Sequence, residues 1–319
     1  MNDVRAFNDL LTKLAASWQA LPDKPEEALE DILRALWYLA AGDPRCIERA
    51  AQAELPLLSE TGLVHLNELV EKRMAGVPLA HLTGRQQFMG IEMLAGPEAL
   101  IPRKETEILG NAALEKLEQL ILERGSAVIV DLCTGSGNLA LALAHCASQC
   151  RVFGSDLSPE AVELARRNAR HLNLQDRVEF REGDFFAPFE SAEFVGQMDM
   201  VVCNPPYISS ANVEVMPDEI SGHEPRLAFD GGPFGVKFMF RLVRKAHRFL
   251  KPGSWLCFEV GLGQGKAMEA RSKGAGHYRN VQSVCNAQGQ IRAILAQTDA
   301  ANATSVTAKR YQENDDKRT

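Results

Sequence analysis

The chain has 319 residues, of which 45% are hydrophobic and 24% are charged. This length is sufficient for one α/β domain of ordinary size and a smaller domain. No segment approaches the run of ~18 apolar residues that spans a membrane, and residues 1–5 lack the pattern of a signal peptide, so we expect a cytoplasmic protein. The formal net charge of −7 argues against a nucleic acid as the main substrate, because phosphate backbones are bound by clustered Lys and Arg.

Two amphipathic helices are predicted in the first part of the chain, residues 1–77. Apolar residues recur at helical spacing from Leu29 to Ala40, and Gly42 is placed to end that helix. A second apolar stripe runs from Leu63 to Val70 and ends before Pro78. We expect the stripes to pack on each other as a small helical domain. Periodicity alone does not tell whether this domain recognises a partner or only forms a core.

Residues 78–104 are predicted to link this helical domain to a larger one. Residues 87–94 are typical of a hairpin that turns at Gly90, and a helix is expected from Glu105. In residues 105–297, strands predicted at 127–132, 151–155, 178–181, 198–203 and 254–260 alternate with helices. This alternation indicates an α/β fold with a doubly wound, Rossmann-like parallel sheet. Strands at 278–285 and 290–295 are close enough to form an antiparallel hairpin, and the polar tail, 298–319, is expected to be disordered.

The first chemical motif follows the strand at 127–132. Small residues let the backbone approach a ligand closely, and a helix start supplies unpaired N–H groups. The segment therefore predicts a cradle for a nucleotide or cofactor, and Asp131 is placed to bind a cofactor amine. The residues expected to form this cradle are Asp131, Cys133, Thr134, Gly135, Ser136 and Gly137.

The next strand ends in Asp156, which is placed to hold both hydroxyls of a ribose. Ser158 is expected to cap the following helix, with Pro159 at its first position. The pattern Gly135-x-Gly137-x-x-Ala140 with an acid about 20 residues later also fits a dinucleotide-binding fingerprint. NAD is therefore an alternative cofactor.

The second chemical motif is Asn204-Pro205-Pro206-Tyr207, directly after the strand at 198–203. The Asn204 side-chain oxygen and the Pro205 carbonyl offer two acceptors for the hydrogens of a planar NH₂ group, because the prolines fix the local backbone. Tyr207 offers a flat face. These residues also suit an ordinary turn. An enzyme that transfers hydride from NAD would not need residues 204–207. Methyl transfer from S-adenosylmethionine explains both these residues and the glycine loop.

With these motifs the chain resembles the release factor glutamine methyltransferases, which are class I S-adenosylmethionine-dependent enzymes with an Asn-Pro-Pro-Tyr signature. The glycine loop occurs in many methyltransferases, and Asn-Pro-Pro-Tyr occurs in enzymes that act on nucleobase amines, but residues 78–107 are specific to the glutamine branch. The likeness also includes Leu100-Ile101-Pro102-Arg103, Thr106-Glu107, Gly183-Asp184-Phe185-Phe186 and Glu224-Pro225-Arg226-Leu227-Ala228.

The resemblance implies a substrate and roles for these residues. The substrate would be the glutamine of a Gly-Gly-Gln motif in a peptide chain release factor, modified on its amide nitrogen. Residues 133–137 would surround the methionine part of the cofactor, Asp156 would bind its ribose, and Asp184 and Phe185 would lie beside its adenine. Residues 204–207 would hold the glutamine, Asn204 would also contact the cofactor, and residues 1–77 would help to recognise the release factor.

Four positions depart from the family pattern. Cys133 replaces the first glycine of the loop and would be strained there at positive φ. Lys104-Glu105 replaces Pro-Asp, and Asn286 stands at the start of the closing hairpin where the family has Asp. Two alternatives therefore stay open: a methyltransferase for a nucleobase or a small-molecule amine or amide, and a cofactor-binding protein without transferase activity.

Three further features have a simple interpretation. The seven cysteines are odd in number and form no Cys-x-x-Cys pair, so we expect reduced core residues and no metal site. The arginines at 166, 167 and 170, and the basic residues from 241 to 248, are interpreted as solvated helix faces, with a footprint on an acidic protein or on a nucleic acid as the alternative. The long segment 208–235 is expected to be a lid over the glutamine pocket.

Overall fold

The computed structural model describes residues 2–16 and 27–299. Most of the predicted disordered tail, 300–319, lies outside these residues. The boundary predicted at 298 is wrong, because Thr298 is the last residue of a strand and its hydroxyl donates to the carbonyl of Lys251 at 2.8 Å.

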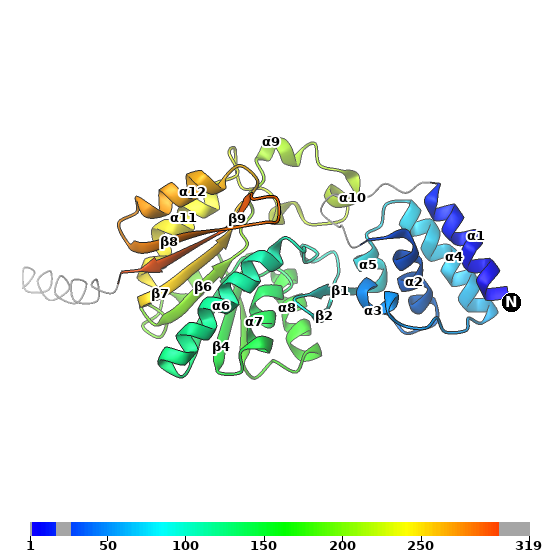
Figure 1. Ribbon diagram of the computed structural model, residues 1–319, viewed down its shortest axis with the longest axis horizontal. Helices are drawn as coiled ribbons and strands as arrows, with labels where there is room; N and C mark the ends of the chain where they lie inside the picture. The colour runs from blue at the N-terminus through cyan, green and yellow to red at the C-terminus, as the bar shows by residue number, and fades with distance from the viewer. Residues whose placement is uncertain (1, 17–26, 300–319) are drawn as a thin grey trace, which may run out of the picture.

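The first part of the chain forms a helical unit at one end of the molecule (Figure 1). Its buried side chains form a separate core that includes Leu33, Leu36, Trp37, Leu66 and Val70. The two predicted apolar stripes therefore pack on each other. The helices within residues 1–77 are α1 (Asn2–Ala15), α2 (Leu29–Ala40), α3 (Ile47–Ala51) and α4 (Glu60–Met74), and the short helix α5 (Leu79–Thr83) follows them.

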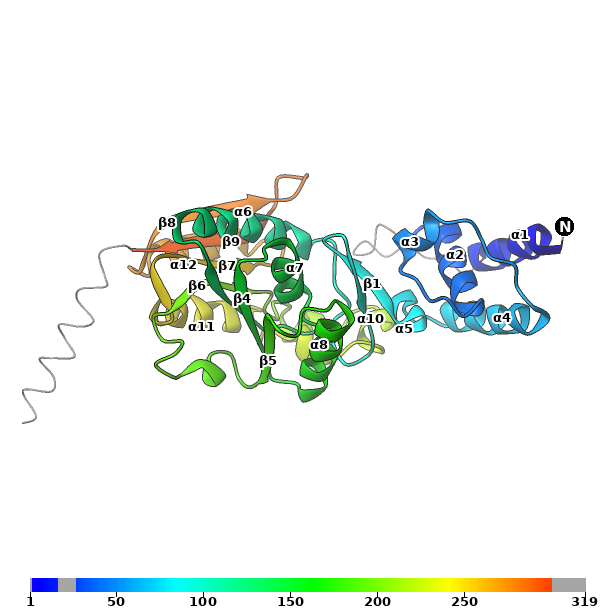
Figure 2. The same cartoon turned by 90° about the horizontal axis from the view of Figure 1, so that it is seen from below.

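A two-stranded hairpin joins this unit to the sheet, as Figure 2 shows. It consists of β1 (Arg85–Phe88) and β2 (Ile91–Leu94), which pair antiparallel across Gly90. Phe88 and Met93 are buried in the core of the sheet domain. Glu92 instead accepts a hydrogen bond from the Cys46 backbone N–H at 2.8 Å, so the hairpin is bonded to both parts of the chain.

The larger part is a seven-stranded sheet in the order β5-β4-β3-β6-β7-β9-β8. The first five strands in this order are parallel, and β9 and β8 add an antiparallel hairpin at one edge. The expected Rossmann-like fold is thereby confirmed. The strands are β3 (Ala127–Leu132), β4 (Cys150–Asp156), β5 (Val178–Glu182), β6 (Met198–Cys203), β7 (Leu250–Glu259), β8 (Tyr278–Cys285) and β9 (Ile291–Thr298).

Helices cover both faces of the sheet, and each face has its own core. Helices α6 (Thr106–Arg124), α7 (Asn138–Cys146) and α8 (Pro159–His171) contribute to one core, and α11 (Lys237–Lys245) and α12 (Gly265–Lys273) to the other. The buried face of α6 includes Leu109, Ala113, Leu117 and Leu120.

The strand order places the two chemical motifs side by side. Strands β3 and β6 are hydrogen-bonded neighbours, with Leu132 opposite Cys203. In the sequence, 65 residues lie between the end of β3 and the start of β6. The chain crosses from one half of the sheet to the other between these two strands. Open α/β sheets bind ligands at such a switch point, at the carboxyl ends of the strands.

Candidate active site

The loop after β3 turns sharply and binds back to β4. The backbone N–H of Thr134 donates to the Ser155 carbonyl at 3.0 Å, and Gly135 and Gly137 have φ of 53° and 84°. A Cβ at Gly137 would lie 2.8 Å from the Phe180 ring, so glycine is needed there for packing. Cys133 has φ of 55°, which is the positive-φ conformation in which a cysteine is strained.

Asp131 is a buried acid, and one of its two carboxylate oxygens has no hydrogen-bond partner. Its Oδ2 accepts hydrogen bonds from the Thr134 hydroxyl at 2.6 Å and from the Ala140 backbone N–H at 3.2 Å. Its Oδ1 is buried without a hydrogen-bond partner. Burial raises the pKa of Asp131 to about 7, against the opposing effect of these two hydrogen bonds. A cationic or N–H donor from a ligand would satisfy Oδ1 and stabilise the ionised acid.

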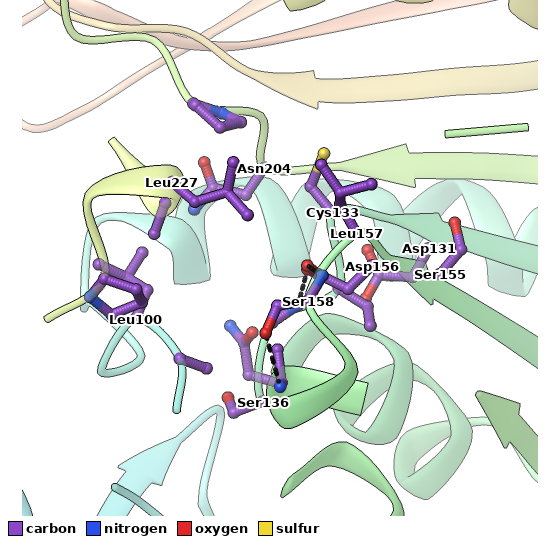
Figure 3. Close-up of a pocket in the computed structure, with 18 of the residues that line it drawn as sticks. Leu100, Asp131, Cys133, Ser136, Ser155, Asp156, Leu157, Ser158, Asn204 and Leu227 are labelled. Atoms are coloured by element: carbon purple, nitrogen blue, oxygen red, sulfur yellow. Dashed lines mark hydrogen bonds between the residues drawn. The ribbon is translucent and has the colours of Figure 1, made fainter. Parts of the chain in front are cut away.

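Asp156 is held firmly at the end of β4. Its Oδ2 accepts from the Gly135 N–H at 2.9 Å and its Oδ1 from the Ser158 N–H at 3.0 Å. Figure 3 shows Asp156 and Ser158 beside the cavity. Burial raises the pKa of Asp156, and the backbone hydrogen bonds oppose this rise. Each oxygen keeps a further lone pair, so the carboxylate can still accept from a ligand.

Asp184 and Phe185 form another wall of the cavity. Arg241 donates to the two oxygens of Asp184 at 2.6 and 2.8 Å and lowers the pKa of this acid. Phe185 has φ of 56°, and its ring stacks on Phe238 with centroids 5.7 Å apart and planes at 17°. This wall is therefore a flat apolar surface bordered by an anchored carboxylate.

At the end of β6, the side chain of Asn204 is oriented by α6. Its Nδ2 donates to the Thr106 hydroxyl at 3.1 Å, which leaves Oδ1 available as an acceptor. In Figure 3, Asn204 and Leu227 border the same cavity as Cys133 and Asp156. Thr106, which belongs to a motif of the resemblance but had no predicted role, also lines this cavity.

A buried glutamate connects both ends of the second motif. Glu259, the last residue of β7, accepts from the Tyr207 hydroxyl at 3.0 Å and pairs with Arg292 at 3.5 Å. Burial raises the pKa of Glu259, while hydrogen bonding from Thr106 lowers it. Burial and the nearby Glu259 in turn raise the pKa of Tyr207. Thr106 and Glu259 thus support Asn204 and Tyr207 together.

Sequence reasoning did not find this support. Glu259 carries a weak signal, because a charged residue that ends an apolar strand needs a partner. Arg292, its partner on β9, lies 33 residues further along the chain, and only the pairing of β7 with β9 brings the two together.

Most predicted site residues border one cavity. Three do not: Gly137 packs behind the loop, and Pro205 and Tyr207 lie outside the lining. Their predicted roles remain predictions. The predicted residues in the lining are Asp131, Cys133, Thr134, Gly135, Ser136, Asp156, Asp184, Phe185, Asn204 and Pro206.

Two loops close over this cavity. Glu224, which is buried, accepts from the Ile101 backbone N–H at 2.8 Å and pairs with Arg103. Leu100 and Leu227 from these two loops line the cavity. The segment from 208 to 235 has its own small core and contains α9 (Ser210–Val213) and α10 (Asp218–Ser221), so it is an ordered cover.

The basic residues noted in the sequence mostly serve the fold. Arg166 donates to the Phe180 carbonyl, Arg167 pairs with Glu98, and Arg170 pairs with Glu163. Arg241 pairs with Asp184. Within residues 2–16 and 27–299, no group of His, Cys, Asp or Glu has the arrangement of a metal site, and no helix is long and apolar enough to cross a membrane.

Comparisons with known proteins agree with this geometry. Residues 123–311 match the model of a methyltransferase domain family. A release factor glutamine methyltransferase from Moorella thermoacetica is 36% identical over 292 residues, which is 92% of this chain and 97% of the relative. Another of that name, from Caulobacter vibrioides, is 33% identical over 279 residues, 85% of this chain and 92% of the relative.

Solved structures support the fold. The hMettl16 catalytic domain, in complex with the MAT2A 3'UTR hairpin 6, matches with a TM-score of 0.51 and 15% sequence identity. The match covers 67% of this chain and 77% of that domain. At this identity the likeness shows a shared methyltransferase fold and carries nothing about the substrate.

Proposed function

Because this chain belongs to the release factor glutamine methyltransferases, we propose that it methylates the side-chain amide nitrogen of a glutamine in peptide chain release factors. The observation that supports this most is a relative of that name aligned over 97% of its own length. The glutamine of a Gly-Gly-Gln motif is the site we propose. Because the relatives are named release factor glutamine methyltransferases, they do not favour the two alternatives, an amine methyltransferase and a cofactor-binding protein without activity.

The residues around the cavity suit S-adenosylmethionine, which when bound supplies an electrophilic methyl group on a sulfonium. We propose that Asp131 accepts a hydrogen bond from its ammonium through the unpartnered Oδ1. Asp156 would accept from the ribose hydroxyls, since its carboxylate is fixed by two backbone N–H groups. The surface of Phe185 and Phe238 suits a flat adenine ring, with Asp184 at its border. The loop from 133 to 137 would enclose the methionine part.

Residues 204–207 would hold the glutamine amide. An amide nitrogen is a poor nucleophile because its lone pair is delocalised, so the site must orient it. With Nδ2 bound to Thr106, Asn204 offers Oδ1 to one amide hydrogen, and the Pro205 carbonyl would take the other. Pro206 borders the cavity. Tyr207 would fix the end of the clamp through its bond to Glu259, as well as offering a flat neighbour to the substrate.

In this reaction the glutamine nitrogen forms a bond to the methyl carbon as the bond from that carbon to sulfur breaks. The methylated nitrogen would be positively charged until it transfers one proton to water, which gives the neutral N-methyl amide. The acceptors of Asn204 and Pro205 would be oriented before the reaction, so they gain strength as positive charge develops on the nitrogen. Most of the acceleration would therefore come from orientation and preorganised acceptors.

We further propose that the helical unit, residues 1–77, helps to recognise the release factor, and that the protein acts in the cytoplasm on this protein substrate. No described residue of the helical unit lines the cavity. A contribution of this unit would therefore concern the protein substrate rather than the cofactor.

The test is methylation of a full-length release factor, with the modified residue identified by mass spectrometry. We expect Asn204→Ala to lower kcat by about 10²–10³, as removal of one preorganised hydrogen-bonding group does in other active sites. Thr106→Val should lower kcat less, because it frees the Asn204 amide without removing it. Unmodified release factor with wild-type protein would refute the function, and near-normal turnover of Asn204→Ala would refute the clamp.

A further inference from the structure

Two exposed apolar side chains lie next to the glutamine clamp without a role in the fold. The side chain of Phe234 is 84% exposed and that of Leu262 is 61% exposed. Phe234 belongs to a turn from Gly231 to Gly235, and Leu262 to a turn between the end of β7 and Gln264. Exposure of a phenyl ring to this extent on an ordered turn leaves it free to contact a partner.

The side-chain amide of Gln264 fastens both turns to the clamp. Its Nε2 donates to the Tyr207 carbonyl at 2.9 Å and to the Gly235 carbonyl at 3.3 Å. Its Oε1 accepts from the Gly261 backbone N–H at 2.8 Å. One amide group therefore joins the backbones of Tyr207, Gly235 and Gly261.

Both turns are also in close packing contact with Tyr207. A Cβ at Gly235, where φ is 68°, would lie 2.2 Å from the Tyr207 carbonyl oxygen, and one at Gly261 would lie 2.9 Å from the Tyr207 ring. Phe234 and Leu262 are the chain neighbours of these two glycines. Their exposed side chains therefore project from two turns that are anchored on the residue ending the clamp.

From this arrangement we propose that Phe234 and Leu262 form an apolar lip, which binds the residues that flank the modified glutamine in a polypeptide substrate. The inference rests on the proposed function, because a glutamine within a chain can reach the clamp only if its neighbours pass over the rim. An aromatic side chain with two rotatable bonds on an anchored turn loses little conformational entropy on contact. The lip therefore contributes to binding of the polypeptide and leaves the chemistry at Asn204 unchanged.

The experiment compares wild-type protein with the double variant Phe234→Ala, Leu262→Ala on a full-length release factor. We expect KM for the release factor to rise about tenfold, the change given by losing roughly 1.4 kcal/mol of apolar burial. We expect kcat within about twofold of wild type, since an interaction made equally in the ground and transition states affects KM alone. With Leu262→Ala kept, replacing Phe234 by leucine (Phe234→Leu) instead of alanine should raise KM for the release factor less than the double alanine variant does. Leu122→Ala, at an 87% exposed position on α6, is the matched control and should change nothing.

Other outcomes would overturn the lip. An unchanged KM in the double variant, while wild-type protein methylates the release factor, would refute the lip and leave the proposed function standing. A fall in melting temperature or in affinity for S-adenosylmethionine would show that the side chains support the fold. If wild-type protein sediments as a dimer and the double variant as a monomer, the surface binds a second copy of this chain instead. Wild-type protein without activity would refute the proposed function and the lip with it.

Discussion

At the residue scale, two buried acids near the clamp have different surroundings. Glu259 is compensated within the protein, because Tyr207 and Arg292 both contact its carboxylate. Asp131 faces no cation of this kind, and its Oδ1 is buried without a hydrogen-bond partner. A buried polar atom without a partner destabilises a fold unless a ligand satisfies it. Glu259 also has one buried oxygen, Oε2, without a hydrogen-bond partner, but the ion pair with Arg292 balances the charge of this acid. Glu259 therefore suits a structural task and Asp131 a ligand-binding one.

This difference predicts that affinity for S-adenosylmethionine depends on pH through Asp131. Burial raises the pKa of Asp131 to about 7 in the free protein, so below that pH the carboxyl must lose a proton before it pairs with an ammonium. Affinity should fall about tenfold per pH unit below this value and level off above it. Calorimetric titrations from about pH 5 to about pH 8 would measure this dependence. In Asp131→Asn, affinity should be weaker and its slope with pH lost; an unchanged slope would contradict the assignment.

The same raised pKa affects stability in the free protein. The folded state holds this proton more tightly than the unfolded chain, so the stabilisation from the neutral acid is fully present below about pH 4. It is lost as the pH rises through about 7. Saturating S-adenosylmethionine should remove this loss, because it would pair with the ionised form.

Cys133 gives a prediction on stability. Its φ of 55° costs a residue with a Cβ about 1–2 kcal/mol, and glycine avoids this cost. Glycine also increases the entropy of the unfolded chain, which offsets part of the gain by about 0.4–1 kcal/mol. We therefore expect Cys133→Gly to raise the melting temperature slightly and Cys133→Val, which is β-branched, to lower it clearly. Equal melting temperatures for the two variants would show that the loop backbone is not strained.

At the scale of elements, the sequence predicted the parallel strands well because they are continuous apolar runs. It missed the beginning of β7, since Pro252 and Gly253 read as a turn, whereas the strand starts at Leu250. The glycine loop and Asp156 were predictable because each is local: a few consecutive residues fix the geometry. The contacts of Asn204 with Thr106 and of Tyr207 with Glu259 join residues 98 and 52 positions apart, so no local pattern reveals them.

The pairing of the two covering loops is another long-range feature, and it leads to a prediction. The Glu224 side chain is fully buried and that of Arg103 is 11% exposed, so Glu224→Gln removes one charge of a buried ion pair. We expect Glu224→Gln to cost about 3 kcal/mol of local stability. The measurement is faster amide hydrogen exchange in residues 208–235, together with weaker binding of S-adenosylmethionine.

A matched control lies in the same segment. Glu214 pairs with Arg226, and both side chains are more than half exposed, so Glu214→Gln should cost far less stability than Glu224→Gln. Equal exchange rates in the Glu214 and Glu224 variants would mean that the buried pair does not hold the cover closed.

At the scale of the whole molecule, polar contacts connect the helical unit to the catalytic part. Glu92 on the hairpin bonds to the Cys46 N–H and to Arg49, and Arg73 on α4 pairs with Glu219 on α10. The covering segment is thus attached both to the cavity, through Glu224, and to the helical unit, through Glu219. Interfaces of this polar kind permit movement between parts more readily than large apolar ones.

This connection predicts a separation between cofactor binding and substrate binding. The double variant Glu92→Ala, Glu219→Ala removes contacts of the helical unit, while the described residues that line the cavity all lie from Glu98 onward. We expect KM for the release factor to rise several-fold and affinity for S-adenosylmethionine to stay within about twofold, because no described residue of the helical unit lines the cavity proposed for the cofactor. Glu115→Gln, a surface change on α6, serves as the control. If cofactor affinity fell while KM for the release factor stayed constant, the helical unit would act by supporting the cavity, and its proposed part in recognition would be wrong.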